Sequence, residues 1–191
     1  MHKDVIKIMK KGLILMATGV EECEALMVVD LVRRASLAMD MASINDDIRV
    51  VSAHNIELKC DVCLANANLA DYDYLVVPGG KVGVDNLAAS QLVSDTIGYF
   101  VNNNKLVAAI CAGPSVIARL GYLDGKNYTV YPGFEGFSDK AIFTNTSCEV
   151  DGNFITANGL GAQFAFVKAI LSAVSDEQTA NNVLASIQYK G

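Results

Sequence analysis

The 191-residue sequence has few charged residues and no long hydrophobic run, and each absence excludes a class of protein. No apolar run approaches the roughly 18 residues that a membrane-spanning helix needs, so we expect no membrane partner. Hydrophobic residues nevertheless make up 52% of the chain and charged residues only 19%. Because a chain of this length is a comfortable single domain, we expect most of this apolar surface to be buried in one core.

The start of the chain, residues 1–11, is rich in lysine, but no basic run that would form a nucleic-acid-binding patch is present. The net charge is -6 at pH 7 and the pI is about 4.8. Because an acidic surface repels the nucleic-acid backbone, we expect no nucleic-acid partner. The five cysteines are odd in number and lack the spacing of a small disulfide scaffold. This pattern favours a reducing compartment, and we expect a cytoplasmic protein.

Two kinds of ligand-binding motif are absent as well. Cys60 and Cys63 form a single C-x-x-C, which lacks the second ligand pair of a structural zinc site, so we expect no metal. Neither a G-x-G-x-x-G nor a P-loop sequence accompanies the glycine pair at residues 79–80. We therefore expect no nucleotide cofactor, and no cofactor of any other kind.

Short apolar runs alternate with helical patterns along the chain. Continuous apolar runs at residues 12–17, 74–77 and 106–110 are typical of strands buried on both faces. The other predicted elements are strands at 39–42, 49–52, 56–60, 128–130, 148–150 and 154–157 and helices at 24–35, 89–101, 114–121, 163–174 and 177–185. The alternation predicts an α/β fold with a mostly parallel sheet and helices on both faces. We expect a hairpin among the strands between residues 39 and 60, and one domain over residues 11–191 after an N-terminal extension of residues 1–10.

Three strand ends carry unusual residues. The loop at 19–24 follows the first buried strand, Pro-Gly-Gly at 78–80 follows the second, and Cys-Ala-Gly-Pro at 111–114 follows the third. Functional groups of an open parallel sheet gather beyond the carboxyl ends of its strands. We therefore expect these three segments to meet in one crevice.

Cys111 lies at a strand-to-helix junction, which is the position of a nucleophile in an elbow turn. Backbone N–H groups at the start of a helix stabilise an anion, and they lower the pKa of a nearby thiol from its usual value of about 8.5. This position predicts a reactive thiolate. Spacing alone leaves open the alternative that Cys111 is a small buried hydrophobic residue.

Four segments together resemble one known family. They are Gly-Val-Glu-Glu-Cys-Glu at 19–24, Val-Val-Pro-Gly-Gly at 76–80, Ala-Ala-Ile-Cys-Ala-Gly-Pro at 108–114, and the segment 150–159. In this order they are similar to the ThiJ/PfpI superfamily, in particular its DJ-1 branch, and the resemblance covers about residues 11–175. It implies a flavodoxin-like, doubly wound sheet sandwiched by helices, with a nucleophile elbow, in a homodimer.

The resemblance also implies roles for individual residues. Cys111 would be the nucleophile, Glu24 would hydrogen-bond its sulfur, and the backbone at Gly79, Gly80 and Ala112 would bind an oxyanion. A carboxyl group must be protonated to donate to a thiolate, so we expect the pKa of Glu24 to be raised. Without the resemblance, Glu24 could equally be a solvated residue in the first turn of a helix.

The sequence departs from the family pattern at Tyr131. Family members described as glyoxalases or deglycases often carry a histidine in this segment, whereas the only histidines here are His2 and His54. A tyrosine hydroxyl at neutral pH is a hydrogen-bond donor rather than a base. We assign Tyr131 as a third catalytic residue, with the alternative that it is a half-buried tyrosine whose hydroxyl is satisfied. Protease-like members place a histidine directly after the cysteine, but Ala112 stands there, which argues against a peptidase.

Two functions follow from these assignments. The leading one is a cofactor-independent glyoxalase or deglycase, in which Cys111 and Glu24 act on methylglyoxal-type aldehydes or on glycated amines. The alternative is a non-enzymatic sensor or chaperone of oxidative stress, in which Cys111 is oxidised to a sulfinate. We place the homodimer interface on the helix at 24–34, with Met27 and Leu31 as surface residues, and we expect Glu21 and Glu22 to be solvated.

Overall fold

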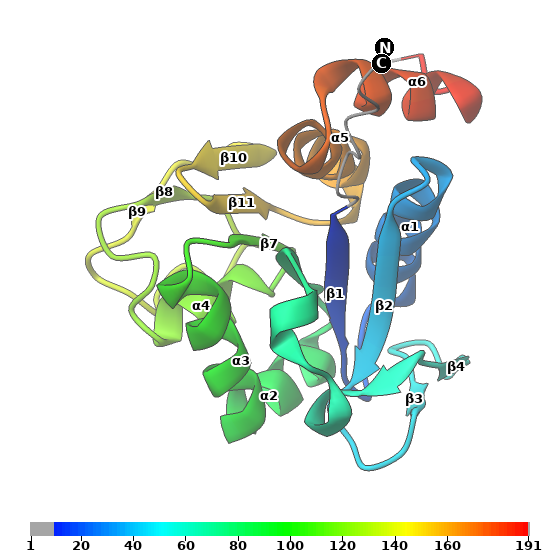
Figure 1. Cartoon of the computed structure of the whole chain (residues 1–191). Helices are drawn as coiled ribbons and strands as arrows, with labels where there is room; N and C mark the ends of the chain where they lie inside the picture. Colours follow the sequence, from blue (N-terminus) through cyan, green and yellow to red (C-terminus); the bar gives the residue numbers. More distant parts are fainter. Residues whose placement is uncertain (1–9, 191) are drawn as a thin grey trace.

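The computed structural model describes residues 10–190, and its centre is a seven-stranded sheet (Figure 1). The strand order is β10-β11-β7-β6-β1-β2-β5. Neighbouring strands are parallel except for β10, which runs antiparallel to β11. The strands of this sheet are β1 (Lys11–Met16), β2 (Ala38–Ser43), β5 (Val62–Cys63), β6 (Tyr74–Val77), β7 (Leu106–Ile110), β10 (Cys148–Asp151) and β11 (Phe154–Ala157).

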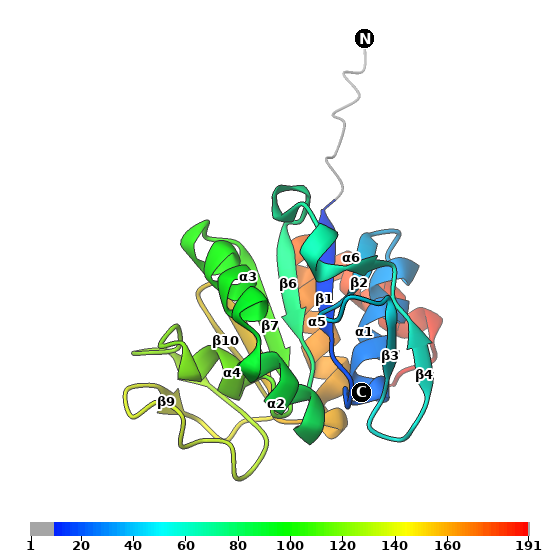
Figure 2. The same cartoon turned by 90° about the horizontal axis from the view of Figure 1, so that it is seen from below.

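Two further pairs of short strands lie outside the main sheet. β3 (Arg49–Val51) and β4 (Glu57–Lys59) form an antiparallel hairpin, and β8 (Asn127–Tyr128) pairs with β9 (Ile142–Phe143). Figure 2 shows the hairpin at the edge of the molecule, away from β6 and β7. The predicted hairpin is confirmed, while the neighbouring predicted strand at 39–42 belongs to the main sheet as β2.

Helices cover both faces of the sheet (Figures 1 and 2). One side carries α1 (Glu22–Arg34), α5 (Gln163–Val174) and α6 (Glu177–Ser186), and the other carries α2 (Lys81–Ala89), α3 (Gln91–Asn102) and α4 (Pro114–Arg119). The predicted doubly wound α/β architecture is therefore confirmed. No helix within residues 10–190 is both long and apolar enough to cross a membrane. The predicted extension falls, apart from its last residue, outside the described part of the chain.

The central strands send alternate side chains into two hydrophobic cores. In β1, Ile14 and Met16 pack into the core beneath α1 and α5, whereas Leu13 and Leu15 pack into the core beneath α2 and α3. The side chains of β6 and β7 divide in the same way. Because both faces of these strands are apolar, their sequences are continuous hydrophobic runs, which is why their positions could be predicted.

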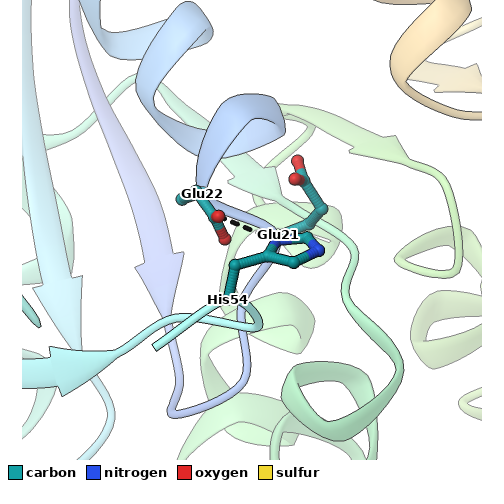
Figure 3. A group of neighbouring side chains, drawn as sticks. All are labelled: Glu21, Glu22 and His54. Carbon is teal, nitrogen blue, oxygen red and sulfur yellow. Dashed lines mark hydrogen bonds and ion pairs between the residues drawn. The ribbon is translucent and has the colours of Figure 1, made fainter. Parts of the chain in front are cut away.

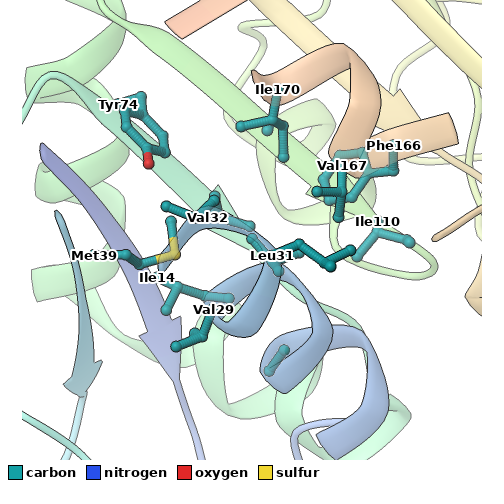
Figure 4. Packing of buried hydrophobic residues seen from close by; sticks show 14 of the residues in the cluster. Ile14, Val29, Leu31, Val32, Met39, Tyr74, Ile110, Phe166, Val167 and Ile170 are labelled. Carbon is teal, nitrogen blue, oxygen red and sulfur yellow. The ribbon is translucent and has the colours of Figure 1, made fainter. Parts of the chain in front are cut away.

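The core on the α1 side joins α1, α5 and the sheet (Figure 4). Leu31 of α1 is only 1% exposed, and Phe166 and Ile170 of α5 are fully buried. The expectation that Leu31 lies at the surface is therefore wrong, because its face of the helix packs on the sheet. The exposed apolar residue on this helix is Leu26, and Met27 is half-buried.

α2 is the principal element that the sequence did not predict. It contains Gly83, and glycine has a low helix propensity. A Cβ atom at Gly83 would lie 2.8 Å from the backbone nitrogen of Val20 and 2.9 Å from the carbonyl carbon of Gly19. The glycine thus lets α2 pack closely on the loop after β1, and this tertiary contact outweighs the local propensity. The two-residue strands β5 and β9 were also missed, because they are too short to show a pattern.

Replacing Phe166 by alanine tests the packing of the α1-side core. Phe166 is fully buried, so Phe166→Ala should lower the free energy of unfolding by about 3–5 kcal/mol. Urea denaturation measures this change. Val150→Ala is the control, because Val150 is 57% exposed on β10 and its loss should cost no more than about 0.5 kcal/mol. Equal losses for the two variants would contradict the placement of α5.

Candidate active site

The three strand ends singled out by the sequence meet at one edge of the sheet. Parallel pairing aligns Ile14 of β1 with Val76 of β6, and Val76 with Ala108 of β7. The loop after β1 is tied to the turn after β6, because the backbone N–H of Glu21 donates to the carbonyl oxygen of Gly79 at 3.1 Å. The predicted crevice therefore forms where these segments follow their strands.

Cys111 occupies a left-handed backbone conformation, with φ of 60°. This conformation is uncommon for a residue with a side chain and is typical of a nucleophile elbow. Two hydrogen bonds of 2.8 Å hold it: the Cys111 N–H donates to the carbonyl oxygen of Ala157, and its carbonyl oxygen accepts from the N–H of Tyr131. The elbow is thus fixed to β11 on one side and to the segment after β8 on the other.

Gly79 lies between the Cys111 thiol and the Glu24 carboxyl group. A Cβ atom at this position would lie 2.5 Å from Glu24 Oε2, 2.5 Å from Cys111 Cβ and 3.0 Å from Cys111 Sγ. Such distances are too short for any side chain. The turn after β6 therefore carries glycine because the two functional side chains meet over its backbone.

Glu24 is buried in the first turn of α1, with 1% of its surface exposed. Its Oε2 accepts a hydrogen bond of 3.1 Å from the N–H of Gly79, and its side chain is also hydrogen-bonded to Cys111. Burial raises the pKa of Glu24 to about 7, and the charge of Glu21 acts in the same direction. The raised pKa was expected, whereas the alternative of a solvated helix residue is wrong.

Burial also raises the pKa of the Cys111 thiol, to about 12, and the negative charge of Glu24 adds to this effect. The N–H groups of Ala112 and Gly80 donate to the sulfur and act in the opposite direction, but they do not outweigh burial. The sequence predicted a lowered pKa for the Cys111 thiol. This prediction is wrong when Glu24 is ionised, because burial and the carboxylate charge then raise the thiol pKa. The position of Cys111 in the chain did not reveal that a buried carboxylate lies beside the sulfur.

The two hydrogen-bonded groups titrate as a pair. The first proton leaves with a pKa of about 7, and the remaining negative charge rests mainly on the Glu24 carboxylate. The minor form, in which Glu24 keeps the proton and Cys111 is a thiolate, is the nucleophilic one.

The backbone groups predicted to bind an oxyanion have different partners. The N–H groups of Gly80 and Ala112 both face the Cys111 sulfur. The N–H of Gly79 donates to Glu24 instead. An anion formed beside the sulfur would therefore find donors at Gly80 and Ala112, while Gly79 positions the carboxyl group.

A cavity of about 380 Å³ opens beside the sulfur. Its lining residues are Glu21, Glu24, Gly80, Lys81, Cys111, Ala112, Tyr131, Phe134 and Leu160. Tyr131, which was predicted, is 49% exposed. Lys81, Phe134 and Leu160 were missed. Lys81 directly follows the glycine turn and Phe134 lies close to Tyr131 in sequence, so both could have been inferred, but nothing in the sequence marks Leu160.

Glu21 and Glu22 are not the free, solvated pair that the sequence suggested (Figure 3). Glu21 caps α1, because its Oε2 accepts a hydrogen bond of 2.7 Å from the N–H of Glu24. Glu22 is only 6% exposed, and its Oε1 lies 2.8 Å from Nδ1 of His54 in the β3–β4 hairpin. Burial opposes its ionisation, but hydrogen bonds, including those to Ser52 and His54, lower the pKa of Glu22 overall.

The ligand-type atoms of Glu21, Glu22 and His54 lie within 4.8 Å of one another. Carboxylate and imidazole groups are common metal ligands. Here, however, Glu22 is bonded to His54 and Glu21 caps α1, so the three side chains serve the hairpin and the helix. Within the described residues, the cysteines of the C-x-x-C belong to no such cluster.

The fold and the site define an α/β protein that carries a cysteine on a strand-to-helix elbow, with a buried glutamate across a glycine turn. Residues 10–173 match the model of the DJ-1/PfpI family. Protein dj-1beta of Drosophila melanogaster is 30% identical over 176 residues, which cover 91% of this chain and 94% of that protein. The Parkinson disease protein 7 homolog of Danio rerio is 30% identical over 185 residues, which cover 95% and 98%.

Solved structures agree with these similarities. The crystal structure of Drosophila melanogaster DJ-1beta superposes with a TM-score of 0.91 at 28% identity, over 96% of this chain and all of that one. Oxidized Toxoplasma gondii DJ-1 gives the same TM-score at 25% identity, over 95% of this chain and all of that one. The chain therefore belongs to the DJ-1/PfpI family and has its flavodoxin-like fold, as the sequence predicted.

The pH dependence of alkylation tests the shared proton. The rate of Cys111 alkylation by iodoacetamide should rise with pH and level off above about pH 7, because the thiolate form appears as the pair loses its first proton. In Glu24→Gln the thiol titrates alone, so the rate should continue to rise beyond pH 8. Peptide mass spectrometry measures both rates.

Exposed Cys23 is the internal reference for this measurement. Desolvation and the negative charges of Glu21, Glu22 and Glu24 raise its pKa, so its alkylation should keep rising across the same range in both proteins. Identical Cys111 profiles in the wild type and in Glu24→Gln would show that the two groups do not share a proton.

Proposed function

We propose that this DJ-1-type protein is a reactive-cysteine stress-protection enzyme, a cofactor-independent glyoxalase or deglycase acting on 2-oxoaldehydes through Cys111 and Glu24. The observation that carries the proposal is the hydrogen-bonded Cys111–Glu24 pair at the base of an open cavity of about 380 Å³. A nucleophile and a proton carrier in direct contact are the two groups that this reaction needs.

The reaction balances without an external oxidant or reductant. The Cys111 sulfur bonds to the aldehyde carbon, and the carbonyl oxygen takes up the proton held by Glu24 to give a hemithioacetal. Glu24 then removes the proton from this carbon while the neighbouring carbonyl oxygen is protonated, which gives an enediol. The neighbouring carbon next receives a proton and the hydroxyl group on the first carbon loses its own, so that the first carbon is oxidised to a thioester and its neighbour is reduced to a carbinol carbon. Water finally cleaves the thioester to a 2-hydroxy acid and frees the thiol.

A pKa of about 7 suits Glu24 to both proton transfers, since an acid–base catalyst works best when its pKa lies near the working pH. The N–H groups of Gly80 and Ala112 are the nearest donors for an oxygen that becomes negative beside the sulfur. A deglycase reaction would use the same groups on the early adduct of an aldehyde with an amine.

The cellular setting is part of the proposal. All five cysteines are free thiols, which fits a cytoplasmic protein.

We also infer a homodimer. Leu26 and Met27 of α1 remain available to an interface, whereas Leu31 does not.

A second candidate is a sensor or chaperone of oxidative stress, favoured by the N–H groups of Gly80 and Ala112 at the sulfur. Two molecules of peroxide would convert the thiolate to a sulfinate and release two molecules of water. The same N–H groups and a protonated Glu24 would hydrogen-bond the sulfinate oxygens. The similar Toxoplasma gondii structure is described as oxidized.

The enzyme proposal is tested by the formation of lactate from methylglyoxal. Wild-type protein should release lactate, and Cys111→Ser should lose at least about a hundredfold in kcat/KM, because an alcohol beside Glu24 is a far weaker nucleophile than a thiolate. Cys23→Ser is the matched control and should retain the wild-type rate. Turnover by Cys111→Ser equal to that of the wild type would rule out this mechanism.

The sensor proposal is tested by peroxide titration at pH 8 with mass analysis of the intact protein and its peptides. Cys111 should gain two oxygen atoms before the other cysteines are modified, because its pair has already lost a proton at this pH. Oxidation of exposed Cys23 ahead of Cys111 would count against a sensor.

A further inference from the structure

The cavity beside Cys111 is larger than methylglyoxal requires. Its volume is about 380 Å³. One water molecule occupies roughly 30 Å³ in the liquid. If each of the five non-hydrogen atoms of methylglyoxal took up that much space, the molecule would fill about 150 Å³. More than half of the space therefore lies beyond the reacting carbons.

Three large, mainly apolar side chains line this cavity. Tyr131 and Leu160 are 49% and 47% exposed, and Phe134 is half-buried beside Tyr131, with the two ring centroids 6.5 Å apart in an edge-to-face arrangement. They come from the segments after β8 and β11, whereas the charged lining residues Glu21 and Lys81 come from the segments after β1 and β6. We call Tyr131, Phe134 and Leu160 the apolar wall.

The apolar wall is held in a fixed position relative to the thiol. The N–H of Tyr131 donates to the carbonyl oxygen of Cys111 at 2.8 Å. The Tyr131 ring also lies against Gly159, the residue before Leu160, where an added Cβ would approach Cδ2 of the ring to 3.4 Å. A substrate bonded to the sulfur would therefore present its substituent to a surface that is already formed.

The geometry points to 2-oxoaldehydes with an aromatic or branched alkyl substituent as the preferred substrates, selected by Phe134 and Leu160 of the apolar wall. This inference rests on the proposed function, because it names the substrate class of the same site. Large apolar side chains left exposed around a reactive group gain from covering by an apolar substituent, which a methyl group supplies poorly. A single methylene in a hydrophobic pocket can change selectivity tenfold or more, so a phenyl group should gain at least about tenfold over methyl.

Alkylation by two α-bromoketones tests the preference without requiring turnover. 2-Bromoacetophenone and bromoacetone carry the same reactive carbon and differ only in a phenyl or a methyl group. Each forms a bond to the Cys111 sulfur and releases bromide. The ratio of their rate constants at Cys111, divided by the same ratio for N-acetylcysteine, should be about ten or more in the wild type.

Variants of the apolar wall test whether its side chains cause the preference for the phenyl group. Leu160→Ala and Phe134→Ala should lower this normalised ratio about fivefold each. Leu160 is nearly half exposed, so its replacement leaves the fold intact even if Phe134→Ala proves unstable. Leu92→Ala is the matched control, because Leu92 is 38% exposed on α3 and is not among the residues lining the cavity. A wild-type ratio near one, or a ratio that Leu160→Ala leaves unchanged, would overturn the inference.

Turnover separates this inference from the proposed function. Phenylglyoxal should give mandelate with a kcat/KM at least about tenfold above that for methylglyoxal. If the alkylation preference is present but neither hydroxy acid forms, the proposed function is wrong, whereas the preference of the apolar wall for large substituents is supported. If both acids form at similar rates and the alkylation ratio is near one, the inferred substrate preference is wrong, whereas the proposed enzymatic function is supported.

Discussion

The contact between the Glu24 carboxyl group and the Cys111 thiol constrains how the surrounding elements must be arranged. It joins the start of α1 to the end of β7 across the turn that follows β6, and it forms because Gly79 has no side chain to separate the two groups. This meeting requires β1, β6 and β7 to be parallel neighbours in a fixed register. That sheet in turn requires an apolar core on each face, which explains why more than half of the chain is hydrophobic.

The pair is an unfavourable arrangement for stability. Burying a carboxyl group costs free energy, and here burial raises its pKa to about 7. Cys111 adds the strain of a positive φ in a residue with a side chain. A simple core would contain neither feature, because an apolar residue in an ordinary conformation would pack as well. Folding alone does not account for their occurrence at one point beside an open cavity, whereas the proposed reactivity requires both.

The sequence predicted the parts of this site that local patterns determine. The buried strands, the glycine turn and the elbow at Cys111 follow from short apolar runs and from the residues after them. Properties set by tertiary contacts could not be read in this way. The burial of Glu22 depends on His54 in a distant hairpin, the helix at α2 depends on the close approach of Gly83 to the loop after β1, and the raised thiol pKa depends on Glu24.

The tyrosine at position 131 affects which residue can transfer protons in the proposed reaction. A histidine in this segment could take part in proton transfer, but Tyr131 is bound to the elbow through its backbone and offers its ring to the cavity. In the proposed reaction the proton therefore moves through Glu24, whose pKa allows it to act as both acid and base. The side chain at position 131 then has no acid–base role in this scheme, and its ring helps to determine the shape of the cavity. Tyr131 thus links the two proposals: the proposed acid–base chemistry needs only Cys111 and Glu24, and the Tyr131 ring joins Phe134 and Leu160 in lining the cavity where a substituent would bind.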